Sequence, residues 1–389
     1  MLTPQGISAV EWATAMPLDL VSDSLPAPRP GDRFEQLLAT VVPAVSRPPC
    51  VVHFTGDCGS CLVLHTATVA ARRLGLPDPI AVTPDYGEAG GGVAPHQEPL
   101  VRELRLADWE RPTVGAEVTD LLGPTALSLL DRFGLLYPCI VNAFTPPLEL
   151  ARGGSIIDGH GIDVMWTVWR GAPLAAALAS RQSRRGYLSA AVALAPRRLR
   201  ERAVRRVLEG RFNFPWLRED ARRDYLDRAV AGLASSPLAF GRSLPLVHRQ
   251  RCWRYWQESM QTVARASDVH LLYPIADPQM IANMAALGRV LGWPSPDALV
   301  RTFAPSLPAR MRALPVRLGL VSYGERARAF AASWDGDSLD ESIVDPSRVR
   351  EAWRQRDVRA GGLLQSAWLS ATGATSGDAP APVAAMRRG

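Results

Sequence analysis

The sequence contains no lysine, and all 44 of its basic residues are arginines. Any mechanism that needs a lysine ammonium group is therefore excluded, and so is the common phosphate-binding loop that ends in Lys-Ser or Lys-Thr. The 38 acidic residues leave a net charge of +6, which is too weak over this length to indicate a nucleic-acid-binding face. We interpret the densest basic run as a solvated helix face and expect no nucleic-acid partner. The run comprises Arg197, Arg198, Arg200, Arg202, Arg205 and Arg206.

Long hydrophobic runs are absent as well. No stretch approaches the roughly 18 apolar residues that cross a bilayer, so we expect no membrane partner. The segment from Met1 to Leu20 includes Glu11 and Asp19, and it lacks the basic start and apolar centre of a secretory signal. Together these absences predict a cytoplasmic location.

Cysteine is scarce, and its five copies are an odd number, which does not indicate a disulfide framework. Only Cys58 and Cys61 are close enough in sequence to act as a unit. Between a strand and a helix they resemble a thioredoxin-type redox pair, a position that lowers the pKa of the first thiol. Asp57 stands where such proteins usually carry an aromatic residue, and its carboxylate would oppose thiolate formation. The redox interpretation remains an alternative.

The sharpest local pattern is a strand, a glycine turn, a helix and a second strand within about 35 residues. Cys50 to Thr55 is a β-branched run suited to a buried strand, and Cys61 to Leu74 has apolar residues at helical spacing. Ile80 to Thr83 reads as the second strand. This βαβ order predicts an α/β fold with a parallel sheet.

The remaining chain is organised around this unit. We predict a leader or linker over 1–45, one large domain over 46–370 and a disordered tail over 371–389. Further strands are expected at 153–158 and 269–272, and a nearly all-helical stretch from about 170 to 266.

The turn from Thr55 to Ser60 is the first candidate site. A glycine turn between a buried strand and a helix directs backbone N–H groups and the helix dipole at an anion. The spacing does not match the dinucleotide pattern. Pattern alone therefore leaves phosphate binding and a plain structural turn both open.

A second glycine turn, Gly159-His160-Gly161-Ile162-Asp163, follows the strand predicted over 153–158. Asp158 and Asp163 offer the carboxylate oxygens that Mg²⁺ prefers, although a turn with a capping aspartate fits equally well. Farther along, Asp277-Pro278 is a favourable helix start.

Taken in order, these segments resemble the synthetase domain of the asparagine synthase family, of the ATP-pyrophosphatase type. The family's nucleotide loop S-G-G-x-D-S corresponds to Thr55-Gly56-Asp57-Cys58-Gly59-Ser60. Its G-x-G-G-D-E motif corresponds to Gly159–Val164, and its P-x-x-D-P motif to Pro274–Pro278. The resemblance covers about residues 48–370.

The resemblance implies an amide-forming ligase that uses ATP and Mg²⁺. A carboxylate attacks the α-phosphate, pyrophosphate leaves, and an amine attacks the acyl-adenylate. The residues implied to bind the nucleotide are Thr55, Gly56, Asp57, Gly59, Ser60, Gly159 and Gly161. The resemblance implies Asp163 as a catalytic residue and metal ligand, with Asp57 as a possible second ligand. It implies Arg317 as the catalytic residue that faces pyrophosphate, and Arg326 lies near the same place in the sequence.

The sequence departs from the family at each point where charge must be neutralised. Gly59 stands at the loop's carboxylate position, Asp57 at its second glycine, and Val164 at the glutamate of the second motif. The family's lysine has no counterpart. These changes predict altered or lost catalysis, so a non-catalytic relative that binds a partner or a small molecule is the main alternative.

Only about 50 residues precede the first predicted strand, so we expect the family's glutaminase domain to be absent. The expected substrate is a small-molecule or peptide carboxylate. The amine is then expected to be free ammonia, a bound amine, or a group supplied by a separate pathway protein.

Overall fold

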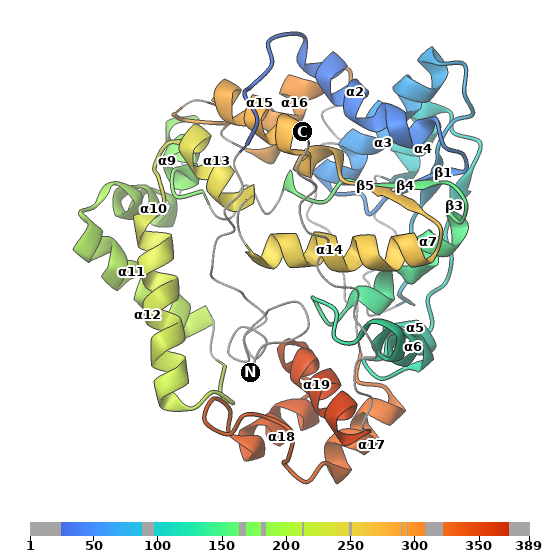
Figure 1. Ribbon diagram of the computed structural model, residues 1–389. Coiled ribbons are helices and arrows are strands. Elements are labelled where there is room, and N and C mark those ends of the chain that lie inside the picture. The colour runs from blue at the N-terminus through green and yellow to red at the C-terminus, as the bar shows by residue number, and fades with distance from the viewer. Residues whose placement is uncertain are drawn as a thin grey trace, which may run out of the picture.

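The computed structural model describes residues 25–87, 97–162, 169–179, 184–211, 214–248, 251–288, 290–293, 295–307 and 322–372. Within these ranges the chain has an α/β fold, with one five-stranded parallel sheet and helices on both of its faces (Figure 1). The predicted fold class, an α/β protein with a parallel sheet, is confirmed at this level.

The strands are short and buried. They are β1 (Cys50–His53), β2 (Ile80–Val82), β3 (Trp109–Glu110), β4 (Ser155–Asp158) and β5 (His270–Leu272). All except β3 lie where strands are predicted from the sequence. A strand of two residues is too short to show an alternating pattern, and β3 was therefore missed.

The order across the sheet is β3-β2-β1-β4-β5, and every neighbouring pair is parallel. The chain moves outward from β1 through β2 to β3, and then returns to the other side of β1 to form β4 and β5. The direction of winding reverses between β1 and β4. In open α/β sheets, ligands bind outside the carboxyl ends of the strands at such a switch point.

Helices make up most of the remaining described chain. Before β4 they are α2 (Arg33–Val45), α3 (Cys58–Arg73), α4 (Gln97–Leu104), α5 (Ala116–Thr119), α6 (Pro124–Phe133), the 3₁₀ turn η2 (Val141–Phe144) and α7 (Thr145–Leu150). Between β4 and β5 they are α9 (Ala172–Ala179), α10 (Arg184–Leu194), α11 (Arg197–Arg211), α12 (Glu219–Ser235), α13 (Phe240–His248) and α14 (Arg251–Ala266). After β5 they are η3 (Pro274–Ala276), α15 (Pro278–Gly288), α16 (Pro296–Phe303), α17 (Glu325–Ser333), α18 (Pro346–Arg354), η5 (Val358–Ala360) and α19 (Gly361–Ala371).

The two faces of the sheet have separate hydrophobic cores. Val52 and Ile157 point to the face covered by α2 and α3, whereas Val51 and Ile156 point to the opposite face. That opposite face is covered by α7 and α14, and Figure 1 shows α14 running across it beside β5. Because consecutive strand residues face opposite sides, strands covered on both sides are apolar throughout, which explains their β-branched composition.

One element inside the predicted leader belongs to the body of the protein. Residues 33–45 form α2, which begins at the N-cap Asp32 and packs against α3 and β4. Leu37, Val41 and Val45 are spaced to form one apolar helix face, and all three are buried. The leader predicted over 1–45 therefore includes thirteen residues, 33–45, that pack against the sheet and α3. Pro43 within the helix obscured the pattern, since proline usually ends a helix.

A third hydrophobic core lies away from the sheet, where α17, α18 and α19 pack together beside η5. Trp216 and Trp353 are its largest fully buried side chains. Figure 1 shows these three helices below the sheet. The predicted arginine run forms part of α11, where Arg197, Arg198 and Arg202 are exposed, as expected for a solvated helix face.

None of the helices in the described ranges combines the length and the apolar character needed to span a membrane.

Candidate functional site

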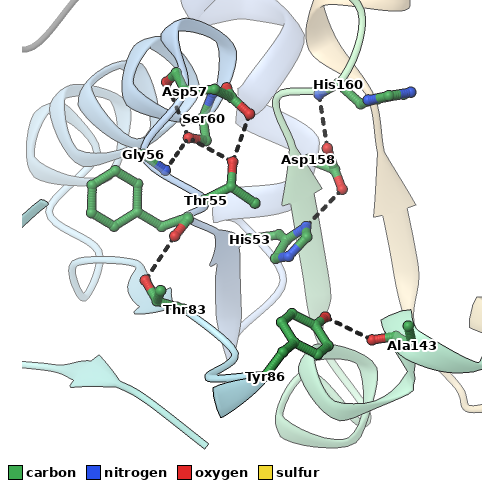
Figure 2. A network of polar contacts seen from close by, with 11 residues as sticks. His53, Thr55, Gly56, Asp57, Ser60, Thr83, Tyr86, Ala143, Asp158 and His160 are labelled. Atoms are coloured by element: carbon green, nitrogen blue, oxygen red, sulfur yellow. Dashed lines mark hydrogen bonds and ion pairs between the residues drawn. The ribbon is translucent and has the colours of Figure 1, made fainter. Parts of the chain in front are cut away.

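The two predicted glycine turns lie at the switch point of the sheet. The first follows β1 and leads into α3, and the second follows β4, the strand hydrogen-bonded to β1. Figure 2 shows both turns at the carboxyl ends of these strands. The sheet therefore brings together two segments that are far apart in sequence, at the position where ligands bind in open α/β folds.

Asp57 is the N-cap of α3. One carboxylate oxygen, Oδ1, accepts a 2.7 Å hydrogen bond from the Ser60 backbone N–H, and the other accepts a 2.6 Å bond from Thr55 Oγ1. Aspartate is favoured at this position because its side chain satisfies a helix N–H and its charge complements the helix dipole. The carboxylate of Asp57 thus holds the turn together.

Ser60 completes this local network. Its hydroxyl accepts a 2.9 Å bond from the Gly56 backbone N–H and donates a 3.1 Å bond to the Asp57 carbonyl (Figure 2). The base of the turn is fixed separately, because the Phe54 carbonyl accepts bonds from Thr83 Oγ1 and Gln97 Nε2. The turn is held in shape by its own side chains, and its base by Thr83 and Gln97.

The two turns meet through Gly59 and Gly159. A Cβ atom on Gly59 would overlap the carbonyl oxygen of Gly159, and a Cβ atom on Gly159 would overlap the Gly59 backbone. Only glycine allows this approach at either position. Gly56 and Gly161 have φ values of +84° and +136°, a region that favours glycine. The glycines therefore fix how the two turns sit against each other.

A buried histidine–aspartate pair lies directly beneath the turns. His53, the last residue of β1, is in register with Asp158, the last residue of β4. Their side chains meet at 3.0 Å, between His53 Nδ1 and Asp158 Oδ2, and the residues are 4% and 8% exposed. The other oxygen, Asp158 Oδ1, accepts a 2.7 Å bond from the His160 backbone N–H.

The pKa of Asp158 lies below its usual value. Burial acts to raise this pKa, but the hydrogen bond and charge of His53, together with His160, lower it further than burial raises it. The carboxyl group is therefore ionised at neutral pH. An ionised carboxylate only accepts hydrogen bonds, so His53 Nδ1 carries the hydrogen that is donated to Asp158.

Aromatic side chains surround this pair. The His53 ring contacts Phe144 edge-on with a centroid distance of 5.7 Å, and Phe144 contacts Trp256 in the same way at 4.9 Å. His160 stacks on Trp253 of α14 at 4.8 Å. The spacing of Trp253 and Trp256 along α14 places both rings on the helix face that covers the sheet.

The predicted site residues fall into two groups. Those expected to bind the nucleotide are brought together at the switch point; they are Thr55, Gly56, Asp57, Gly59, Ser60, Gly159 and Gly161. Asp163 and Arg317 lie outside the described residues. Arg326 is exposed on α17, which packs with α18 and α19. Asp277 caps α15, since its side chain accepts hydrogen bonds from the N–H groups of Gln279 and Met280.

Across the described ranges, no three or more His, Cys, Asp or Glu side chains are grouped to hold a metal ion. Because Asp163 lies outside those ranges, the predicted magnesium ligands are not tested by this finding.

The Cys58–Cys61 pair lies in a buried part of α3. Cys61 is fully buried and Cys58 is 7% exposed. Burial, and next the charge of Asp57, raise the pKa of the Cys61 thiol well above its ordinary value. Reactive thiols are partly exposed and lie in electropositive surroundings. The observed surroundings disfavour a redox role.

Reasoning from the sequence missed the role of His53. It appeared only as part of a predicted strand, and Asp158 was considered as a magnesium ligand. The available signal was that two predicted strands each end in a charged or titratable residue. If the strands are neighbours, such residues lie side by side at the carboxyl edge of the sheet.

No protein-family model and no curated protein matches the chain. The fold and the site define a doubly wound α/β protein with two glycine turns at the switch point of its sheet. What this site can do must be inferred from its own residues.

Proposed function

We propose that this protein is an asparagine-synthase-like ligase that uses ATP to join a carboxylate to an amine. One observation carries the proposal: the three motifs that resemble the family follow three adjacent strands. Residues 55–60 follow β1, residues 159–162 follow β4, and residues 274–278 follow β5. Parallel neighbours end at the same edge of the sheet, so all three segments can contribute to a single ligand site. The sheet would then be of the ATP-pyrophosphatase type.

The glycine turns fit a nucleotide in shape. Gly59 and Gly159 leave the backbone bare where the two turns meet, and the positive end of the α3 dipole points toward the same region. Thr55, Gly56 and Ser60 would line the phosphate side of the site. Gly161 would allow the second turn to approach the nucleotide.

Asp57 places a condition on phosphate binding. Its negative charge sits at the helix terminus that would attract a phosphate, so a triphosphate fits there only with a cation between the two groups. Asp57 and Asp163 would hold Mg²⁺ in this arrangement. The ion would supply neutralisation of the pyrophosphate charge.

The reaction class follows from the resemblance. A small-molecule or peptide carboxylate would attack the α-phosphate of ATP, releasing pyrophosphate, and an amine would then displace AMP from the acyl-adenylate. Arg317 would face the pyrophosphate, where its guanidinium would donate hydrogen bonds in place of the family's lysine.

A non-catalytic relative is the second candidate, and the pairing of Asp57 favours it. Both carboxylate oxygens of Asp57 already have partners within the turn. A carboxylate committed to capping a helix explains the turn without any metal or nucleotide.

Calorimetric titration of the purified protein with ATP, with and without Mg²⁺, separates the two candidates. The key variant is Asp57→Asn, which keeps a good N-cap residue and removes the charge. The ligase proposal expects magnesium-dependent binding that weakens in the variant. The matched control is Asp345→Asn, because Asp345 caps α18 in the same way, and this change should leave binding unaltered.

Three outcomes of the titration contradict the ligase proposal in whole or in part. Absence of binding at millimolar ATP, with and without Mg²⁺, would rule out nucleotide chemistry and favour the non-catalytic relative. Tighter binding in Asp57→Asn would mean that Asp57 repels the phosphates and does not hold the metal. Equal losses in both variants would reflect helix capping in general.

A further inference from the structure

Helices α9 and α10 are packed in an unusual way, because they bury small residues and expose large apolar ones. Helix α10 buries Ala190 and Ala193, while its Leu188 and Leu194 are 65% and 57% exposed. Helix α9 likewise buries Ala175 and exposes a leucine. Single exposed apolar residues are common, but a helix normally turns its largest apolar residues toward a core. Exposed leucines on consecutive helices therefore indicate a surface that binds a partner.

The exposed apolar residues continue along α11. Leu208 of this helix is buried in a core shared with α12, whereas Leu199 and Val207 are exposed. Figure 1 shows α10 and α11 at the outer edge of the molecule. We call this region the arm surface. Its apolar members, which are 37% to 66% exposed, are Leu178, Leu188, Val192, Leu194, Leu199 and Val207.

The arm surface is also strongly basic. Residues 184–211 contain nine arginines and two glutamates, a net charge of +7, whereas the whole sequence has a net charge of +6. Arg198, Arg202 and Arg206 are exposed and form the basic part of the arm surface. None of the three has a hydrogen-bond or ion-pair partner among the described residues.

The neighbouring helix α12 balances its charge within itself. Its three arginines pair with acidic residues of the same helix: Arg222 with Glu219 at 3.0 Å, Arg223 with Asp220 at 3.4 Å, and Arg228 with Asp224 at 2.9 Å. Such pairs, three or four residues apart, are typical of a solvated helix face. The arm surface has an excess of positive charge beside its leucines, so its complement is a segment that is both apolar and acidic.

Residues 1–24, which lie outside the described ranges, have this composition. They contain three acidic residues, Glu11, Asp19 and Asp23, and no basic residue. Large apolar residues such as Trp12 and Met16 lie among them. The segment therefore matches the arm surface in charge and in apolar character.

The other long stretches outside the described ranges have the wrong charge. Residues 308–321 contain three arginines and no acidic residue, and residues 373–389 contain two arginines and one aspartate. Both would be repelled by the arginines of the arm surface. Charge complementarity thus favours residues 1–24 as the occupant.

The segment is also within reach of the arm surface. Leu25, the first described residue, packs against the hydrophobic core that contains Ala175 of α9. Helix α9 contacts α10, and α10 contacts α11. A stretch of 24 residues can extend up to about 80 Å, whereas the 11 residues of α10 cover about 16 Å.

We propose that residues 1–24 bind the arm surface of the same molecule. The apolar side chains of the segment cover the exposed leucines, and its carboxylates pair with Arg198, Arg202 and Arg206. This contact does not depend on the proposed ligase function.

Photo-crosslinking of the full chain tests the contact. The photoreactive amino acid p-benzoylphenylalanine replaces Trp12, the dilute protein is irradiated, and mass spectrometry locates the crosslinked peptides. We expect crosslinks within single molecules, from residue 12 to the peptides that contain α9, α10 and α11.

Two triple variants test the role of charge. Arg198→Gln/Arg202→Gln/Arg206→Gln removes the unpaired arginines and should lower the crosslink yield about threefold or more, because several exposed ion pairs are lost together. Arg222→Gln/Arg223→Gln/Arg228→Gln is the matched control. It removes the same total charge from α12, where the arginines already have partners, and should leave the yield unchanged.

A pair of single variants tests the apolar contact. Leu188→Ser should lower the crosslink yield, because the segment then covers a polar side chain at the centre of α10. Leu74→Ser is the control, since Leu74 is 50% exposed but lies at the end of α3. That variant should give the parent yield.

Crosslinks to other parts of the chain, or no crosslink at all, would overturn the proposal, and so would equal losses in the two triple variants. Crosslinked dimers as the main product would also overturn it and assign the arm surface to the segment of a second copy. Sedimentation of the parent protein with phosphatidylglycerol vesicles but not with phosphatidylcholine vesicles, without a crosslink to α9–α11, would overturn it in favour of an anionic membrane surface.

Discussion

The turn from Thr55 to Ser60 and the buried cluster of His53, Trp256 and Tyr273 lie at the same edge of the sheet, yet they differ in how their polar groups are paired. In the turn, Asp57 and Ser60 satisfy one another and the backbone around them. In the cluster, three buried polar atoms have no partner within the described chain. A self-paired region stabilises the fold, whereas a region with unmet hydrogen bonds is available to a ligand. Removing a paired group should therefore reduce stability, whereas removing one of the three unpaired polar atoms should leave stability nearly unchanged.

The largest expected loss of stability is for Gly159→Ala. The new Cβ would overlap the backbone of Gly59, and neither turn can move without disturbing β1 or β4. We expect the free energy of unfolding to fall by about 3 kcal/mol or more in urea denaturation. Gly210→Ala is the control, because a Cβ on this α11 residue meets no atom, and the higher helix propensity of alanine should raise the free energy of unfolding by up to about 1 kcal/mol. Equal effects would mean that the turns do not pack as described.

His53→Leu should have the next largest effect. The change leaves the Asp158 carboxylate buried without its partner, and a buried charge that loses its partner destabilises a protein by about 3 kcal/mol. The double variant His53→Leu/Asp158→Leu should recover much of this loss, because no charge then remains buried. A double variant no more stable than the single one would show that the pair matters through packing alone.

The pH dependence of stability tests the same pair. The pKa of Asp158 is lowered in the folded protein from an ordinary value of 3.8. Its contribution to stability is therefore fully present above that value and is lost as the pH falls through the lower folded pKa. In denaturation curves at decreasing pH, the parent protein should lose more stability below about pH 4 than Asp158→Asn does. Parallel curves would contradict the lowered pKa.

Asp57→Ala should have a moderate effect. Losing an N-cap side chain costs about 1 kcal/mol, and here it also removes the closer of two acceptors of the Thr55 hydroxyl, the other being the Ser60 hydroxyl at 3.2 Å. Asp345→Ala removes the equivalent cap of α18 and provides the scale for capping alone. If Asp57→Ala proved more stable than the parent protein, the carboxylate would be strained for function and would not act mainly as a cap.

Local patterns predicted the parts of the fold that local patterns determine. The β-branched run at 50–53, the glycine turn after it and the helix that follows are encoded within a few residues. The capping role of Asp57 is equally local, since aspartate between a strand and a helix is a favoured N-cap. It was missed because the resemblance directed attention to phosphate and metal ligands.

The His53–Asp158 pair could not be predicted from local patterns. The contact depends on β4 inserting beside β1 and not beside β3, and strand order is set by the packing of the whole sheet. The partners of Trp256 and Tyr273 depend in the same way on how α14 crosses the sheet face. Each of these residues stands alone in the sequence, and only the fold brings them together.

Tyr273→Phe should have the smallest effect on stability. Its hydroxyl has no partner in the described chain, so removing it sacrifices no hydrogen bond and relieves the burial of an unsatisfied group. We expect the free energy of unfolding to stay within about 0.5 kcal/mol of the parent value or to rise slightly. Chemical denaturation of the variant and the parent protein measures this difference. A large loss of stability would show that the hydroxyl has a structural partner and that the cluster is a closed core.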